Sequence, residues 1–442
     1  MSWLTRYRIR HYVSNSFWIL PLASMVAALL VARLLHGLEE FEGWGSKINP
    51  DTARAVLGTL ASSMFTFIVF VCSALLVAVQ LASAQLTPRI IGIVFRDPVT
   101  KFSSTLFVFA FAFTLAVMVR IDPTVYRASA IAAAYSCLAS LAVFLYLIDH
   151  VGKSLRPSGA VGSVGRLGRE VIENVYPQPL ANAPATLPTE GSFLDDEPVD
   201  VIRSPKDGVI LAFDVPGLVS LAQRYDCMIE MVPQVGDFVA VGDHLFRIFR
   251  PGATVPAAVL SRSLAIGQER TLEQDPTFAF RILVDIASKG LSPAINDPTT
   301  AVLAIDQIHH LLRNVGSRFL RDGQVRDAAG QLRLLYRTPN WDDFVYLAVT
   351  EIRQFGSESI QVARRLRAML EDLIRTLPVE RHSLLRQELD LLHRSAERFF
   401  SEPEDRALAA VSDLQGVGGK TDTTHRRGKP GDQRTRVKVT AE

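Results

Sequence analysis

Polar residues that could carry chemistry concentrate between positions 270 and 306, inside a segment that is otherwise apolar and helical in pattern. Arg281, Asp285 and Lys289 follow one another at intervals of four residues, so they share one face of a helix and can form salt bridges along it. Carboxylate and amide oxygens could also bind an ion or a polar ligand. Helix caps explain some of the same residues, because an Asp stands before a Pro twice in this segment. The candidates for a ligand or interface site are Arg270, Asp275, Arg281, Asp285, Asn296 and Asp297.

Other patterns typical of catalysis or metal binding are missing from the sequence. Cys72, Cys137 and Cys227 have no CxxC spacing, which argues against a disulfide framework and a structural zinc site. No nucleophile–base pair is visible, so we expect no enzyme activity, no cofactor and no bound metal. Lys plus Arg is 47 and Asp plus Glu is 45, which leaves a net charge of +2 and no case for nucleic-acid binding.

Four apolar runs near the start of the chain predict membrane spans. The chain is 48% hydrophobic and 21% charged, and its mean hydropathy is +0.20. A span needs about 20 mostly apolar residues. The runs at residues 17–35, 56–79, 102–119 and 130–148 approach or meet this length. The first run is longer than the apolar region of a signal peptide, so we expect an uncleaved anchor.

The orientation follows from the basic residues in the loops. Arginines precede the first span, and further basic residues lie between the second and third spans and after the fourth. The positive-inside rule then places both termini in the cytoplasm, together with nearly 300 C-terminal residues.

The second apolar run carries a stripe of polar side chains. Thr59, Thr66, Ser73 and Gln80 recur every seven residues, with Ser62 beside them, so they lie along one face of the helix. Small polar residues on such a face form either a helix-packing seam or the water-lined wall of an oligomeric pore. The stripe contains no ionisable residue, which argues against a proton relay. The helix is expected to end before Pro88.

The remaining chain changes character several times. We divide the whole into a transmembrane domain (1–155), a helix and Pro-rich linker (156–198), a small β domain (199–252), a helical cytoplasmic domain (253–412) and a disordered basic tail (413–442). Glycines at every third position from Gly159 to Gly168 predict a flexible exit from the fourth span. Period-two alternation predicts the β domain, and a further strand is expected at 332–336. The fold class is a four-helix membrane domain plus a cytoplasmic α+β region with a helical C-terminal part.

Two resemblances add to this interpretation. The string from Val235 to Leu245 is similar to the turn of barrel-sandwich domains of the biotinyl/lipoyl type, which implies a β-barrel-like subdomain, although the modifiable lysine is missing. The motifs at 85–89, 96–97, 270–278 and 291–301 resemble a bacterial family of predicted membrane proteins, domain of unknown function 2254. That resemblance covers most of residues 10–400. It implies four spans in the bacterial inner membrane and no assigned chemistry.

Two functional hypotheses remain open. In the first, the protein is a homo-oligomer in the bilayer with a pore-like or transport role, a second span that lines the path, and a regulatory cytoplasmic domain. In the second, it is a non-conducting anchor or scaffold whose cytoplasmic domain binds a partner protein or small ligand.

Overall fold

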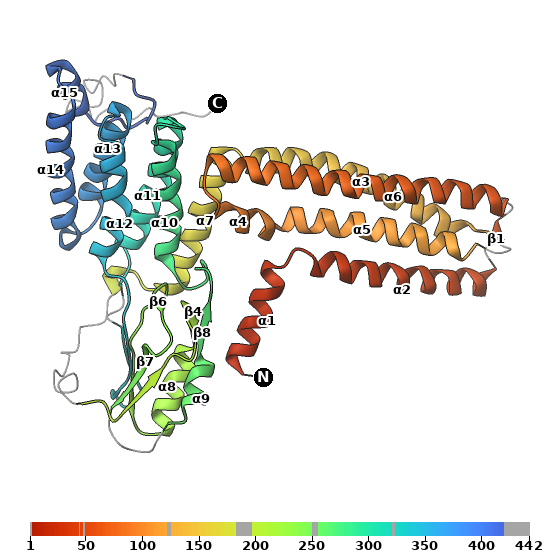
Figure 1. Cartoon of the computed structure of the whole chain (residues 1–442), viewed down its shortest axis with the longest axis horizontal. Helices are drawn as coiled ribbons and strands as arrows, with labels where there is room; N and C mark the ends of the chain where they lie inside the picture. The colour runs from red at the N-terminus through yellow and green to blue at the C-terminus, as the bar shows by residue number, and fades with distance from the viewer. Residues whose placement is uncertain are drawn as a thin grey trace, which may run out of the picture.

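The four predicted spans form one elongated bundle. The structure is a computed structural model that describes residues 2–43, 45–46, 49–121, 125–182, 197–249, 255–320 and 323–419. The long apolar helices lie side by side and project away from the rest of the molecule (Figure 1). They are α2 (Ile19–Glu42), α3 (Pro50–Gln85), α5 (Pro98–Val119) and α6 (Arg127–Ser154). All four are long and apolar enough to cross a membrane, so the described residues hold four candidate spans, as predicted.

Helix α5 lies at the centre of this bundle and contacts each of the other three. Half of its most apolar window is buried, against 17% for α2 and 22% for each of α3 and α6. The outer helices therefore keep large faces that the described part of the chain does not cover. At the far end of the bundle, the short strands β1 (Gly45–Ser46) and β2 (Val125–Tyr126) pair in antiparallel fashion. They connect the end of α2 to the start of α6.

Helix α3 is much longer than a bilayer crossing requires. Asn49 caps its start and Leu86 its end, as Pro88 predicts. Its 36 residues span about 54 Å, against about 30 Å of hydrocarbon. Val79 and Leu86 at its end, with Ile90 of α4 (Ile90–Arg96), pack into the core of the C-terminal helical domain. The second span is thus built directly into that domain.

The N-terminal helix α1 (Trp3–Asn15) packs mainly against the β region and α4, and Lys101 of α5 donates to its Ser14 carbonyl. Trp3 and Tyr7 stack on each other and contact the apolar surface of strands β4 and β8. His11 bonds Glu273 at 2.8 Å. Burial alone would raise the pKa of Glu273, but the hydrogen bond with His11, together with Tyr7 and the charge of Arg96, holds that pKa below its ordinary value.

This contact predicts an acid-sensitive position for α1. A carboxylate with a lowered folded-state pKa stabilises docking at pH values above its ordinary pKa of about 4.3, and the contribution is lost as pH falls through the lowered value. A spin label on Arg8→Cys, in a chain with Cys72→Ala, should gain mobility below about pH 4. The Glu273→Gln variant should be mobile at neutral pH already. Identical spectra of the two chains from pH 7 to pH 3 would show that Glu273 does not hold α1.

The glycine-rich segment is a helix, so the prediction of a flexible exit is wrong. Helix α7 (Pro157–Val175) runs without a break through all four glycines. A Cβ at Gly168 would lie 2.7 Å from Ala279 Cβ, and one at Gly165 would lie 2.2 Å from Gln307 Oε1. These glycines let α7 approach α10 and α11 closely, so they serve packing rather than flexibility.

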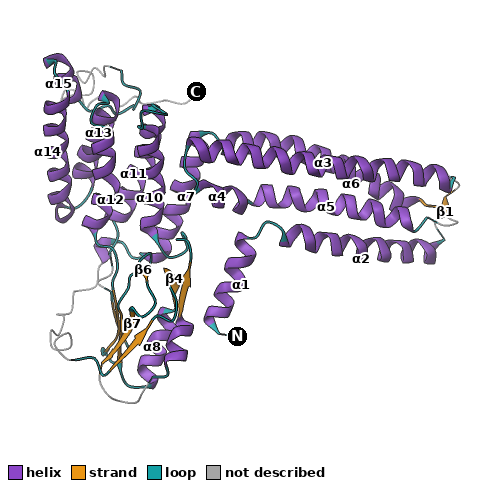
Figure 2. Ribbon diagram, viewed as in Figure 1, coloured by secondary structure: helices purple, strands orange, loops and turns teal. Residues whose placement is uncertain are grey.

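Two open sheets make up the β region, and the predicted barrel-like closure is not confirmed among the described residues (Figure 2). The five-stranded sheet has the order β3-β7-β5-β10-β9, and the three-stranded sheet has the order β6-β4-β8. β5 and β10 are parallel, and the other neighbours are antiparallel. The strands are β3 (Asp200–Arg203), β4 (Gly208–Phe213), β5 (Met228–Met231), β6 (Phe238–Val239), β7 (His244–Phe249), β8 (Leu264–Gly267), β9 (Gln324–Arg326) and β10 (Leu332–Tyr336). The sheets thus recruit strands from beyond residues 199–252.

A second bundle of helices forms the C-terminal helical domain. Its core joins α7 and the end of α3 to the apolar faces of α10–α14. The helices are α10 (Pro276–Gly290), α11 (Pro298–Gly316), α12 (Trp341–Phe355), α13 (Ile360–Thr376), α14 (His382–Phe399) and α15 (Pro403–Ala409), while α8 (Val215–Arg224) and α9 (Ala257–Leu260) flank the sheets. Short 3-10 turns occur at Leu180–Asn182, Ser261–Ser263 and Val379–Arg381.

The predicted linker and tail are described only in part. Residues 183–196 and 420–442 lie outside the described residues. The segment before residue 420 bonds to α13, where the fully buried Arg364 donates to the carbonyls of Val411, Gly418 and Gly419.

Candidate functional site

The polar stripe of α3 lies on the face that the bundle leaves uncovered. Thr59, Thr66 and Ser73 are exposed, and each hydroxyl donates to the carbonyl four residues earlier, at 2.9, 3.1 and 2.9 Å. Ser62 and Gln80 are exposed as well. The side chains that α3 buries in the bundle are apolar, among them Leu57, Ala61, Met64, Val71 and Leu75. A packing role and a pore role for the stripe therefore both require a neighbour beyond the described part of this chain.

A charged network ties the end of α3 to α10, and we call it the α3–α10 junction. Arg89, in the turn between α3 and α4, forms an ion pair with Asp285. Asp285 also accepts from Arg281 Nε at 2.7 Å. Arg281 in turn reaches Glu351 of α12 with two parallel hydrogen bonds of 2.5 and 2.8 Å. Lys289 Nζ donates to the backbone carbonyl of Ser83, at 3.1 Å.

Electrostatics explain why the junction holds together. Asp285 lies between two arginines and is 20% exposed. The hydrogen bond from Arg281 lowers the pKa of Glu351, so this carboxyl stays ionised. Burial lowers the pKa of Arg89, and the nearby positive charge of Arg281 lowers it further. Without the Asp285 carboxylate the two guanidinium groups would repel each other.

The six predicted residues fall into three separate places. Arg281 and Asp285 belong to the junction. Arg270 donates to the carbonyl of Gly236 in the turn before β6, at 2.9 and 2.5 Å, and Asp275, which caps α10, lies against the same glycine. Asp297 caps α11. Asn296 precedes the second cap with a φ of 47°.

Asp275 is the most deeply buried of these residues, at 2% exposure. Its Oδ1 accepts from the N–H of Phe278, and its Oδ2 has no hydrogen-bond partner in the described residues. Burial raises the pKa of its carboxyl. The cap role accounts for one oxygen only.

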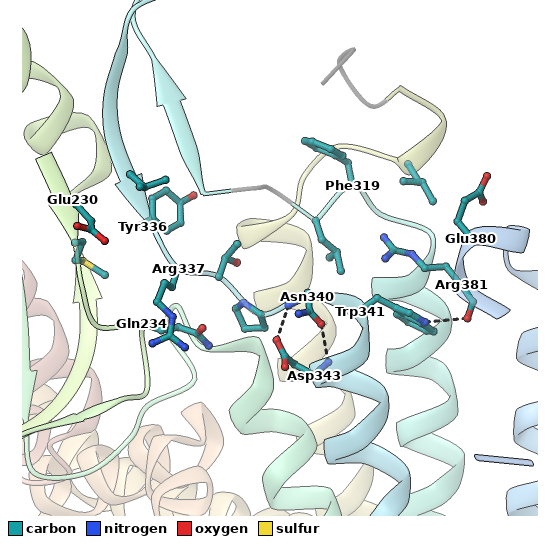
Figure 3. A pocket seen from close by; sticks show the side chains of 16 residues that line it. Glu230, Gln234, Phe319, Tyr336, Arg337, Asn340, Trp341, Asp343, Glu380 and Arg381 are labelled. Atoms are coloured by element: carbon teal, nitrogen blue, oxygen red, sulfur yellow. Dashed lines mark hydrogen bonds between the residues drawn. The ribbon is translucent and has the colours of Figure 1, made fainter. Parts of the chain in front are cut away.

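One large cleft was not foreseen from the sequence. This interdomain cleft measures about 810 Å³ and lies between β5 and β10 on one side and the start of α12 on the other. Figure 3 shows Arg337 and Arg381 on either side of Asn340 and Trp341. The Arg381 guanidinium carbon lies 5.4 Å from the Trp341 ring centroid, and its Nε has no partner in the described part.

Arg337 and Arg381 line the cleft together with three carboxylates, Glu230, Asp343 and Glu380, so its charge is mixed. Aromatic rings add an apolar surface, so the cleft suits a small polar molecule with an apolar part. Asn340 and Asp343 form a capping box that fixes its floor (Figure 3). Sequence patterns identify residues 338–343 only as the start of a helix, since the strand that forms the opposite wall lies about 100 residues earlier.

Comparison with known proteins places these features in a family. The family model described as predicted membrane protein DUF2254 matches residues 14–372. An uncharacterized protein of Mycobacterium bovis is 27% identical over 434 residues, which cover 91% of this chain and 80% of the relative. An uncharacterized protein of Mycobacterium tuberculosis H37Rv shows the same identity and coverage. No solved structure matches significantly. The chain thus belongs to the DUF2254 family of predicted membrane proteins.

Proposed function

We propose that several copies of this chain assemble in the bacterial inner membrane so that their α3 helices face one another and line a polar path. The observation that carries the proposal is the placement of the Thr59–Gln80 stripe on the uncovered face of α3. Lipid favours apolar side chains on such a face, and polar ones favour a helix partner or water. The stripe hydroxyls donate to backbone carbonyls of their own helix, so their hydrogen-bond donors are satisfied even when the path contains no water.

The cytoplasmic domain is suited to regulate this path. The end of α3 is part of the helical core, and the α3–α10 junction adds ion pairs to that contact. A shift of α10 therefore moves α3. The interdomain cleft, bounded by α12, offers a place where a ligand could drive such a shift. In this proposal both termini lie in the cytoplasm, as the loop charges predict.

A second candidate function is a non-conducting scaffold, and the interdomain cleft is the observation that favours it. In this case the α3 faces of neighbouring copies pack without water between them. The cytoplasmic domain then binds its ligand or partner independently of any flux.

Cysteine substitution distinguishes these functions. In a Cys72→Ala chain in membranes, Thr66→Cys or Ser73→Cys should cross-link between copies on oxidation and react with a small aqueous thiol reagent. Leu145→Cys on α6 is the matched control, because it is 62% exposed and lies at similar depth, as the Phe67–Phe144 ring contact of 4.9 Å indicates.

The outcomes separate clearly. Cross-linking with aqueous reactivity supports the polar path, and cross-linking without it supports the scaffold. A monomeric mass in detergent, with Thr66→Cys no more reactive than Leu145→Cys, would overturn both proposals of an assembly through α3.

A further inference from the structure

A small cavity lies where the bundle meets the cytoplasmic domain, and we call it the boundary cavity. It measures about 150 Å³ and is enclosed by α4, the start of α5, the end of α6 and α7. One wall is apolar and includes Ile90, Val151 and Leu155. Since α5 starts at Pro98 and α6 ends at Ser154, the cavity lies at one end of the apolar bundle, the level at which lipid tails would give way to headgroups.

The polar wall carries two arginines, and neither forms an ion pair with a carboxylate among the described residues. Arg96 is half-buried, and no hydrogen bond or ion pair of its guanidinium is found within the described ranges. Glu273 attracts it, but that carboxylate bonds His11. Arg166 is exposed and bonds only Ser163 of its own helix, at 3.4 Å, among the residues described.

The one carboxylate that lines the cavity is already engaged. Asp97 Oδ2 accepts from the N–H and the hydroxyl of Thr100, at 2.9 and 3.0 Å, and contacts His150 Nε2 at 3.1 Å. It caps α5 and does not pair with either arginine. The cavity therefore presents positive charge on one wall and hydrocarbon on the other.

A half-buried guanidinium is costly to leave without an anion, and burial indeed lowers the pKa of Arg96. Arginine forms its strongest contacts with phosphate and carboxylate groups. Basic pockets between spans on the cytoplasmic side suit lipid headgroups in particular. We propose that the boundary cavity binds the phosphate of an anionic phospholipid headgroup through Arg96 and Arg166, with the glycerol and first methylenes against its apolar wall.

The inference does not depend on whether α3 lines a path. If it is correct, the bound lipid links α4, α5, α6 and α7, so it should stabilise the joint between bundle and cytoplasmic domain. The phosphate could also come from solution, and the test separates the two sources.

The test uses the full chain in neutral detergent. Phosphatidylglycerol, phosphatidylcholine and inorganic phosphate are added separately, and retained lipid and the thermal midpoint are measured by native mass spectrometry and a melting assay. We expect phosphatidylglycerol to bind and raise the midpoint. Arg96→Gln with Arg166→Gln should weaken its binding at least about tenfold, the loss expected when a charge-assisted hydrogen bond is removed.

Arg169→Gln is the matched control, because Arg169 is exposed on the same helix and does not line the cavity. Arg166→Gln alone keeps the test valid should the double variant unfold, since Arg166 is at the surface. Equal binding of the Arg166 and Arg169 variants would overturn the proposal. An equal effect of inorganic phosphate would overturn the lipid as the source.

Discussion

Asp285→Ala is expected to loosen the α3–α10 junction and to cost about 2 kcal/mol, the range for lost hydrogen bonds to charged groups. The variant removes the one carboxylate that lies between Arg89 and Arg281. At about 2–4 °C per kcal/mol for a domain of this size, the thermal midpoint in detergent should fall by about 4–8 °C. Amides of residues 83–96 should also exchange faster with deuterium, because the end of α3 loses its attachment.

The control for Asp285→Ala is an ion pair of the same charges that is more exposed to solvent. Asp149 and Lys153 pair at 2.6 Å on α6, but their side chains are 58% and 68% exposed. Asp149→Ala should therefore cost less than about 0.5 kcal/mol. A double-mutant cycle of Arg89→Ala and Asp285→Ala should give a coupling of at least about 1 kcal/mol. Additive effects of the two changes would mean that the ion pair does not hold the junction.

The sequence predicts the membrane domain well because local composition determines it. An apolar run of sufficient length forms a helix in lipid whatever the rest of the chain does. The end of α3 before Pro88 and the caps at Asp275 and Asp297 are equally local. Each depends on a proline and the residues directly before it. These features agree with the structure closely.

The β region and the cleft depend on contacts between distant segments. Period-two alternation identifies β5 and β10 as strands, but nothing local pairs Leu334 with Ile229 across 105 positions. This parallel pairing brings Tyr336 and Arg337 beside Gln234 and so creates the cleft. The predicted β domain ends at residue 252, so it contains neither Tyr336 nor Arg337.

The candidate site shows the same limit. Arg281 and Asp285 are neighbours on a helix, so their pairing follows from the spacing of four. Arg89 and Glu351, which complete the network, come from positions 196 residues before and 66 residues after Asp285. Spacing also suggested one cluster for six residues that the fold separates, because they lie before α10, along α10 and at the start of α11, and these places pack against different elements.

Gly168→Ala is expected to destabilise the protein by about 2 kcal/mol, although alanine is the better helix former. The added Cβ would lie 2.7 Å from Ala279 Cβ and 3.0 Å from Leu311 Cδ1. Ala279 has no rotamer by which to move away, so α7 must shift from α10. The thermal midpoint of the full chain should fall by about 4–8 °C.

The same substitution six residues earlier on this helix should act in the opposite direction. A Cβ at Gly162 meets no atom within 4 Å, and the residue is well inside α7. Gly162→Ala should therefore gain up to about 1 kcal/mol from helix propensity alone. Opposite signs for one chemical change on one helix would establish that the glycine pattern serves close packing. A gain at both positions would mean instead that α7 does not approach α10 closely and that the glycines provide flexibility at the exit of the fourth span.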